Sequence, residues 1–132
     1  MHFLIDMLTL KFNHATCLAR MSSRMDVNWD ETTNQEKGML QASILYQRAA
    51  GIYDDILSEL YAIQRVPKKN YWSTFKKFSG LDLQTKTISM LKNVMMAQAQ
   101  YLLFNNMQLK VAKNALDIKD EKVGLYFSSI TL

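Results

Sequence analysis

Few side chains in this sequence belong to the types that carry out covalent or metal chemistry. Cys17 is the single cysteine, and His2 and His14 are the only histidines. A nucleophile needs a base within hydrogen-bond reach, and a zinc site needs closely placed Cys and His ligands. These residues form neither a convincing catalytic set nor a cluster at metal-ligand spacing. The sequence therefore predicts a protein that is not an enzyme and holds no metal or cofactor, and a lone cysteine fits a reducing cytosolic compartment.

Residues 65–81 offer binding chemistry instead, because they combine basic and aromatic side chains without an acidic one. A solvated loop with a few packed rings is the commonest outcome for such a connection. Contact with an anionic membrane is the second interpretation, since each lysine near the leaflet contributes about 1 kcal/mol and tryptophan and tyrosine favour the interface. Nucleic-acid binding is the third, but the rest of the chain has no basic stripe. The residues expected at a membrane surface are Lys68, Lys69, Trp72, Lys76 and Lys77.

The composition indicates an all-α fold. A length of 132 residues with 48% hydrophobic content suffices for one compact core, and one proline and four glycines leave few turn signals for a β protein. Asp, Lys, Gln or Asn interrupts every apolar stretch, so no run approaches the roughly eighteen apolar residues of a membrane span. The net charge of +4 is compatible with an ordinary surface. The sequence thus predicts one soluble helical region over residues 1–132.

Apolar residues recur at helical spacing in two long segments before Pro67. The first predicted helix runs from residue 3 to about residue 25. The polar stretch 26–35 separates it from the second, residues 34–64. Because the residue before a proline disfavours helical geometry, the second helix should end at or before Val66.

A third predicted helix, residues 83–110, is apolar almost all the way round. Its two stripes are Ile88, Leu91, Met95, Ala99 and Leu102, and Met90, Val94, Ala97, Tyr101 and Phe104. A helix that is apolar all round is normally buried. We therefore expect this helix to be central in the fold and antiparallel to residues 34–64.

Small residues predict where these two helices cross. A glycine inside a helix costs about 1 kcal/mol relative to alanine unless close packing offsets it, so we place Ala49 and Gly51 at one crossing. Ala97 and Ala99 would lie opposite. A Gly51→Leu substitution should then destabilise the fold by about 1–3 kcal/mol through overpacking.

A separate fourth helix is expected to begin between Leu116 and Lys119 and to stay apolar up to Leu132. An apolar end without an evident partner is typical of one piece of a larger domain. Long antiparallel helices joined in sequence favour a bundle or an α-solenoid.

Three segments resemble the BRO-one domain, the helical scaffold of ALIX-type adaptor proteins. FNHATCLARMSSRMD at residues 12–26 resembles the family's FN-x-A-A-L-x-S-x-x-A helix. GMLQASILYQRAAGIY at residues 38–53 is similar to its Gly-Leu pair, aromatic-Gln pair and small-small-Gly turn. Residues 81–104 contain LDL and then MMAQAQ, which is the most specific match. The order and spacing of all three segments agree with the family.

The resemblance implies both a fold and a function. The fold would be a solenoid-like, TPR-like bundle of long antiparallel helices, with this chain as the central part of a larger domain. The function would be that of a cytoplasmic adaptor at endosomal membranes, acting in endosomal sorting or membrane remodelling. Its partner would be the amphipathic tail helix of an ESCRT-III subunit, which docks on an apolar patch.

The resemblance also carries over a set of binding positions: Glu36, Leu40, Leu103, Leu116, Lys119 and Val123. Leu103 stands where the family has an aromatic anchor, Glu36 at an acidic rim position, and Leu40 where the family has lysine. The last three are further members of the patch. For each position the alternative is an ordinary core residue. The alternative function is a structural helical module that self-associates through its apolar third helix and its apolar end, without binding an ESCRT-III subunit.

Overall fold

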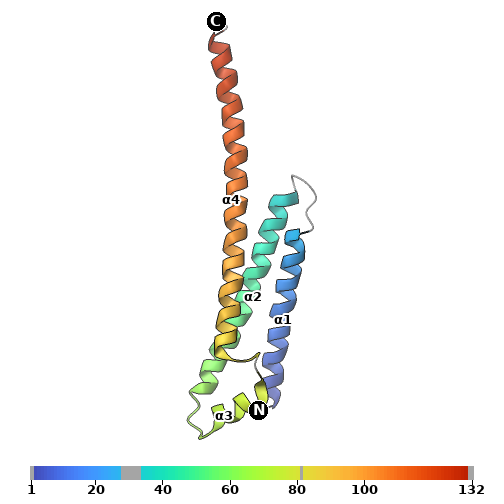
Figure 1. The fold of residues 1–132 in the computed structure, drawn as a ribbon, viewed down its shortest axis with the longest axis vertical. Helices are drawn as coiled ribbons and strands as arrows, with labels where there is room; N and C mark the ends of the chain where they lie inside the picture. The colour runs from blue at the N-terminus through green and yellow to red at the C-terminus, as the bar shows by residue number, and fades with distance from the viewer. Residues whose placement is uncertain (1, 28–33, 81, 131–132) are drawn as a thin grey trace.

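The computed structural model describes the backbone of residues 2–27, 34–80 and 82–130, with side chains for residues 2–25, 36–80 and 82–116. These residues form α1 (His2–Val27), α2 (Asn34–Gln64), α3 (Tyr71–Ser79) and α4 (Thr85–Ile130), without any strand. Helices α1 and α4 both lie along α2 and run antiparallel to it, while short α3 lies across one end (Figure 1). The all-α prediction is confirmed. Solenoid-like stacking stays a prediction.

The central helix is α2, since it packs against each of the other three helices. Its apolar residues at 3.6-residue spacing face two ways and build two core clusters. The larger cluster brings all four helices together around Leu8, Ile56, Leu60, Phe75 and Ile88, which are each fully buried. The smaller one, near the start of α2, joins α2 to α4 through Met39, Ala42, Tyr46, Ala99 and Leu102.

Polar contacts fix α2 against both neighbours. The buried hydroxyl of Ser43 donates to the Ala99 carbonyl of α4 at 3.0 Å. On the other side, the Lys11 ammonium of α1 donates to the carboxylates of Asp55 at 2.7 Å and Glu59 at 2.5 Å. The hydrogen bonds to Asp55 and Glu59 raise the pKa of Lys11 above its ordinary value. This contribution to stability is therefore present below the ordinary lysine pKa and is lost as the pH rises through the folded-state value.

The connection expected over residues 65–81 contains a helix, α3, that the sequence analysis did not predict. Pro67 follows the end of α2 as expected. Asn70 then adopts left-handed geometry with φ 68°, and its carbonyl accepts the Thr74 amide at 3.0 Å. This bond closes the first turn of α3. Phe75 on α3 is fully buried, which attaches the short helix to the larger cluster.

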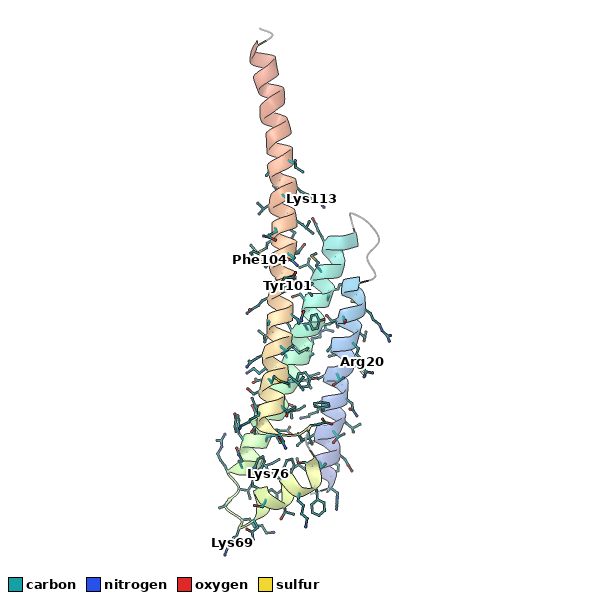
Figure 2. The ribbon with its side chains drawn as sticks, in the orientation of Figure 1. Arg20, Lys69, Lys76, Tyr101, Phe104 and Lys113 are labelled. Carbon is teal, nitrogen blue, oxygen red and sulfur yellow. The ribbon has the colours of Figure 1, made fainter. Side chains whose placement is uncertain are left out.

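Two expectations for the third helix are wrong. Helix α4 continues through residue 116 to Ile130, so no separate fourth helix begins near Leu116. The helix is also peripheral: one stripe faces α2, whereas the second stripe, with Tyr101 62% and Phe104 59% exposed, faces solvent. Figure 2 shows Phe104 on the side of α4 away from α2. The apolar second stripe is therefore surface, although its composition is that of a core.

The predicted crossing is half right. Ala49 and Ala99 are buried, and Ala99 meets Ser43 as described above. Gly51 is exposed, and a Cβ added to it would meet nothing within 4 Å. Ala97 is exposed as well. The overpacking expected for Gly51→Leu is therefore wrong, because a side chain at this position would point into open space.

Candidate functional site

The candidate site lies along the seam where α2 and α4 meet solvent. Lys92 of α4 donates to Asp54 of α2 at 2.8 Å and marks one side of this seam. Leu40 lies fourteen residues before Asp54, and Leu103 lies eleven residues after Lys92. These spacings are close to four and three helical turns, so both leucines lie on the side marked by the ion pair. The structure thus brings together the first two carried-over apolar positions.

These leucines also lie at the same level of the antiparallel pair. The Ser43–Ala99 hydrogen bond sets the level, and Leu40 and Leu103 are each about one turn from it, in the same direction. Leu40 is 36% exposed and Leu103 is half-buried, and neither belongs to a core cluster. Both are therefore at least partly accessible apolar residues beside the seam, outside the two core clusters.

Met96 joins the two leucines, although the sequence analysis did not select it. It lies seven residues before Leu103, hence on the same face of α4, and is 39% exposed. We call Leu40, Met96 and Leu103 the seam patch. The seven-residue spacing of Met96 and Leu103 was the available sequence signal, but neither residue belongs to the two apolar stripes that the sequence analysis followed.

The carried-over acidic residue, Glu36, lies at the end of the seam patch opposite to the Lys92–Asp54 pair. Glu36 accepts a hydrogen bond from Lys113 of α4 at 2.9 Å, and Figure 2 shows Lys113 on the side of α4 that faces α2. The Glu36 side chain is 27% exposed. Two exposed ion pairs, Lys92–Asp54 and Lys113–Glu36, therefore bracket an apolar strip, which is the arrangement of a hydrophobic centre with a polar rim.

A shallow groove extends the seam beyond the Lys92–Asp54 pair. It has a volume of about 640 Å³ and is lined by Tyr61 of α2 and by Thr85, Lys86, Ser89, Met90, Asn93, Val94 and Ala97 of α4. Tyr61 is seven residues after Asp54, so the groove lies on the same side of α2 as the seam patch.

Of the remaining carried-over positions, Leu116 does not join the seam patch. Leu116 is 61% exposed, but it lies thirteen residues after Leu103 on one continuous helix. At about 100° per residue this places Leu116 well over a quarter turn away from Leu103 around α4. Lys119 and Val123 belong to α4, and their side chains lie outside the described residues.

The basic segment forms the end of the bundle opposite to Lys113 (Figure 2). Lys68, Lys69, Lys76 and Lys77 are all exposed. Trp72 is half-buried: its ring stacks on Phe75 at 5.6 Å, and the Lys76 ammonium lies 5.5 Å from the ring centroid. Exposed apolar rings at this end include Phe78, 55% exposed, and Phe3 of α1, 81% exposed. His2 contacts Phe78 at 5.8 Å, which brings the start of α1 beside α3.

Within the described residues, no three or more His, Cys, Asp or Glu side chains are grouped so that they could hold a metal ion. Long as α4 is, no helix in the described part of the chain has a stretch apolar enough to cross a bilayer. The chain matches no protein-family model, no curated protein and no solved structure.

Proposed function

We propose that this chain is a non-enzymatic adaptor that binds an amphipathic helix of a partner protein along the α2–α4 seam. The observation that supports this function best is the seam patch, an accessible apolar strip on two packed helices with an ion pair at each end. Helix-in-groove recognition needs such a strip for the apolar face of the incoming helix and polar groups at its rim. The resemblance to BRO-one domains suggests the tail helix of an ESCRT-III subunit as the partner.

The dimensions of the seam suit a helix of ordinary length. Lys92 and Lys113 are twenty-one residues apart on α4, which is about 32 Å. A partner helix of about twenty residues would span this distance. Its apolar residues at positions i, i+3 or i+4, and i+7 would meet the seam patch, while its polar face would stay in water.

The rim offers one acid and one base at the same point, since Glu36 and Lys113 form a pair. A partner helix with one acidic and one basic residue at this end could form its own ion pairs with Lys113 and Glu36. Breaking the Glu36–Lys113 pair would cost little, because exposed ion pairs contribute only about 0–1 kcal/mol. Leu40, where the family has lysine, instead enlarges the apolar centre. We therefore expect a partner helix that is more apolar here than the usual BRO-one ligand.

Replacing Leu103 by Asp tests this function directly. The substitution places a charge at the centre of the seam patch, and the loss of one such anchor typically costs about 2 kcal/mol or more. Binding of ESCRT-III tail peptides should therefore weaken by about thirtyfold or more. Peptide titrations by calorimetry would measure this, and circular dichroism melts would confirm that the variant is folded.

Leu10→Asp is the matched control, because Leu10 is 69% exposed on α1, away from the seam. It makes the same chemical change and should leave peptide affinity unaltered. If the folded native chain binds no tail peptide, or if Leu10→Asp weakens binding as much as Leu103→Asp does, the seam is not the docking site.

A second function, contact with an anionic membrane such as the endosomal surface, is favoured by the basic end of the bundle. Its exposed lysines lie on and just before α3, which also carries exposed Phe78, and the start of α1 with exposed Phe3 lies beside α3. Lysines attract acidic headgroups while exposed rings insert at the interface. Trp72 does not insert into the membrane in this proposal. Its ring stacks on Phe75 and contacts the Lys76 ammonium, which positions that cation at this end.

Removing two of these charges should weaken vesicle binding measurably. For Lys68→Gln with Lys69→Gln, we expect about thirtyfold weaker binding to vesicles that contain phosphatidylserine, since each lysine contributes about 1 kcal/mol. Co-sedimentation would measure it. Lys37→Gln with Lys110→Gln removes the same net charge from exposed lysines near the other end of the bundle and should have little effect. Equal losses in the two double variants would show that binding follows net charge and not this end of the molecule.

A further inference from the structure

The outward stripe of α4 has the spacing of a coiled-coil seam. Its residues alternate steps of four and three: Met90, Val94, Ala97, Tyr101, Phe104, Gln108, Val111 and Ala115. All eight are exposed. Seven of them are apolar, and the stripe covers about three and a half heptads, which is the length over which such a pattern favours helix pairing. None of these residues belongs to a core cluster or to the seam patch, although Met90, Val94 and Ala97 also line the groove beside Tyr61 of α2.

From this stripe we propose that α4 pairs with α4 of a second copy of this chain, and that the two helices run antiparallel. The inference goes beyond the adaptor function, because it uses different residues. Partner, orientation and contact residues each follow from a separate property of the stripe.

The absence of charge beside the stripe favours a second copy as the partner. In a coiled coil, the residues on either side of the apolar seam select partners through their charges. Here these positions are Leu91, Asn93, Gln98, Gln100, Asn105, Met107, Ala112 and Asn114, and none is charged. The nearby cations Lys92, Lys110 and Lys113 lie outside these positions. A charged partner would therefore find no counter-charge along the stripe, whereas two identical neutral faces meet without repulsion.

The exposed area is consistent with a stable contact. The rings of Tyr101 and Phe104 are 62% and 59% exposed, and Met90 and Val111 are 56% and 64% exposed. Aromatic side chains bury about 150–250 Å² each, so the two rings alone offer roughly 200–300 Å² per copy. With the aliphatic residues between Met90 and Gln108, along about 27 Å of helix, the pair approaches the lower range of specific interfaces. Aromatic residues and Met are also the types enriched in such interfaces.

Side-chain size selects the antiparallel orientation. Parallel helices would place each residue against its own copy, so that Ala97 faces Ala97 and Tyr101 faces Tyr101. The Ala97 layer would then be loosely filled, and the Tyr101 and Phe104 layers would be crowded. In the antiparallel register, Ala97 faces Tyr101 of the second copy and Val94 faces its Phe104, so small residues accept large ones. Alternation of large and small residues across facing positions is what dense packing requires.

The experiment is sedimentation of the native chain and of Tyr101→Glu with Phe104→Glu. The native chain should sediment as a dimer at micromolar concentrations, and the double variant should have a dissociation constant at least about a hundredfold higher. Phe3→Glu with Leu10→Glu is the matched control, since these α1 residues are 81% and 69% exposed. It should remain dimeric. Thermal melts check that both double variants are folded, and Leu103→Asp should keep the dimer even where it abolishes peptide binding.

A spin label at Asn114→Cys, in a chain where Cys17→Ser removes the exposed native thiol, reports the orientation. Antiparallel pairing in the stated register places Asn114 opposite residue 84, so two labels should be about 45 Å apart. Parallel pairing would bring them within about 15 Å. A native chain that stays monomeric, a stripe variant that still dimerises, or a short label distance would each overturn the proposal.

Discussion

Leu102→Asp is expected to abolish the cooperative thermal transition of this chain or to lower its Tm by at least about 12 °C. Leu102 is 1% exposed and lies in the smaller cluster beside Ala99 and Met39. A carboxylate there loses its hydration without gaining a partner, and such substitutions reach about 4 kcal/mol or more. Each kcal/mol lowers the Tm of a domain of this size by roughly 3–5 °C. Circular dichroism at 222 nm would follow the transition.

Its neighbour Leu103 provides the control, since Leu103→Asp makes the same change one position along α4. Leu103 is half-buried and belongs to neither core cluster, so its carboxylate can remain hydrated. We expect a stability loss below about 1 kcal/mol. Two equally damaging substitutions would mean that α4 presents a different face to α2, and the seam patch would then be part of the core.

Phe75→Ala should cost about 3–5 kcal/mol, the second largest effect. The ring of Phe75 is fully buried in the larger cluster and stacks against Trp72 at an interplanar angle of 12°. It is the one fully buried residue among the described residues of α3. Its loss therefore removes both a core volume and the attachment of α3. Urea denaturation would show a lower midpoint with little change in slope if the transition stays two-state.

Phe78→Ala removes an equal ring from the same helix, but this ring is 55% exposed. It should shift the urea midpoint by less than about 1 kcal/mol. A Phe78 variant as damaging as the Phe75 variant would show that α3 is held by its outer ring, against the buried position of Phe75.

Periodicity was sufficient to predict α1 and α2. Both contain apolar residues at regular helical spacing, and Pro67 marks the end of α2, so local signals and tertiary packing agree. The prediction failed for α3 because a segment rich in lysines and rings was read as a connection. The spacing of Trp72, Phe75 and Phe78 follows a helix, and only Phe75 turned out to be fully buried.

The length and position of α4 required different information. No glycine or proline lies between Leu83 and Lys122, so the sequence contains no stop signal at the expected break near Leu116. The absence of a glycine or proline could have been used to predict one continuous helix. The apolar pattern after residue 116 was instead interpreted as a separate helix. The peripheral position of α4 could not be predicted from composition. An apolar stripe has the same sequence whether it faces a core or a second molecule. The same limit explains Gly51, whose expected close crossing depends on a neighbour that is absent on that side.

The two core clusters differ in how many helices hold them, and this difference sets where the bundle opens locally. The larger cluster joins four helices around Ile56 and Leu60, whereas the fully buried part of the smaller one comes from α2 and α4 alone. Local unfolding starts where the fewest apolar contacts oppose it. We therefore expect the start of α2, with Leu40, to exchange its amide hydrogens sooner than residues 53–63. A helix docked on the seam would protect those amides first, since a ligand stabilises most the part of a protein whose opening destroys its site.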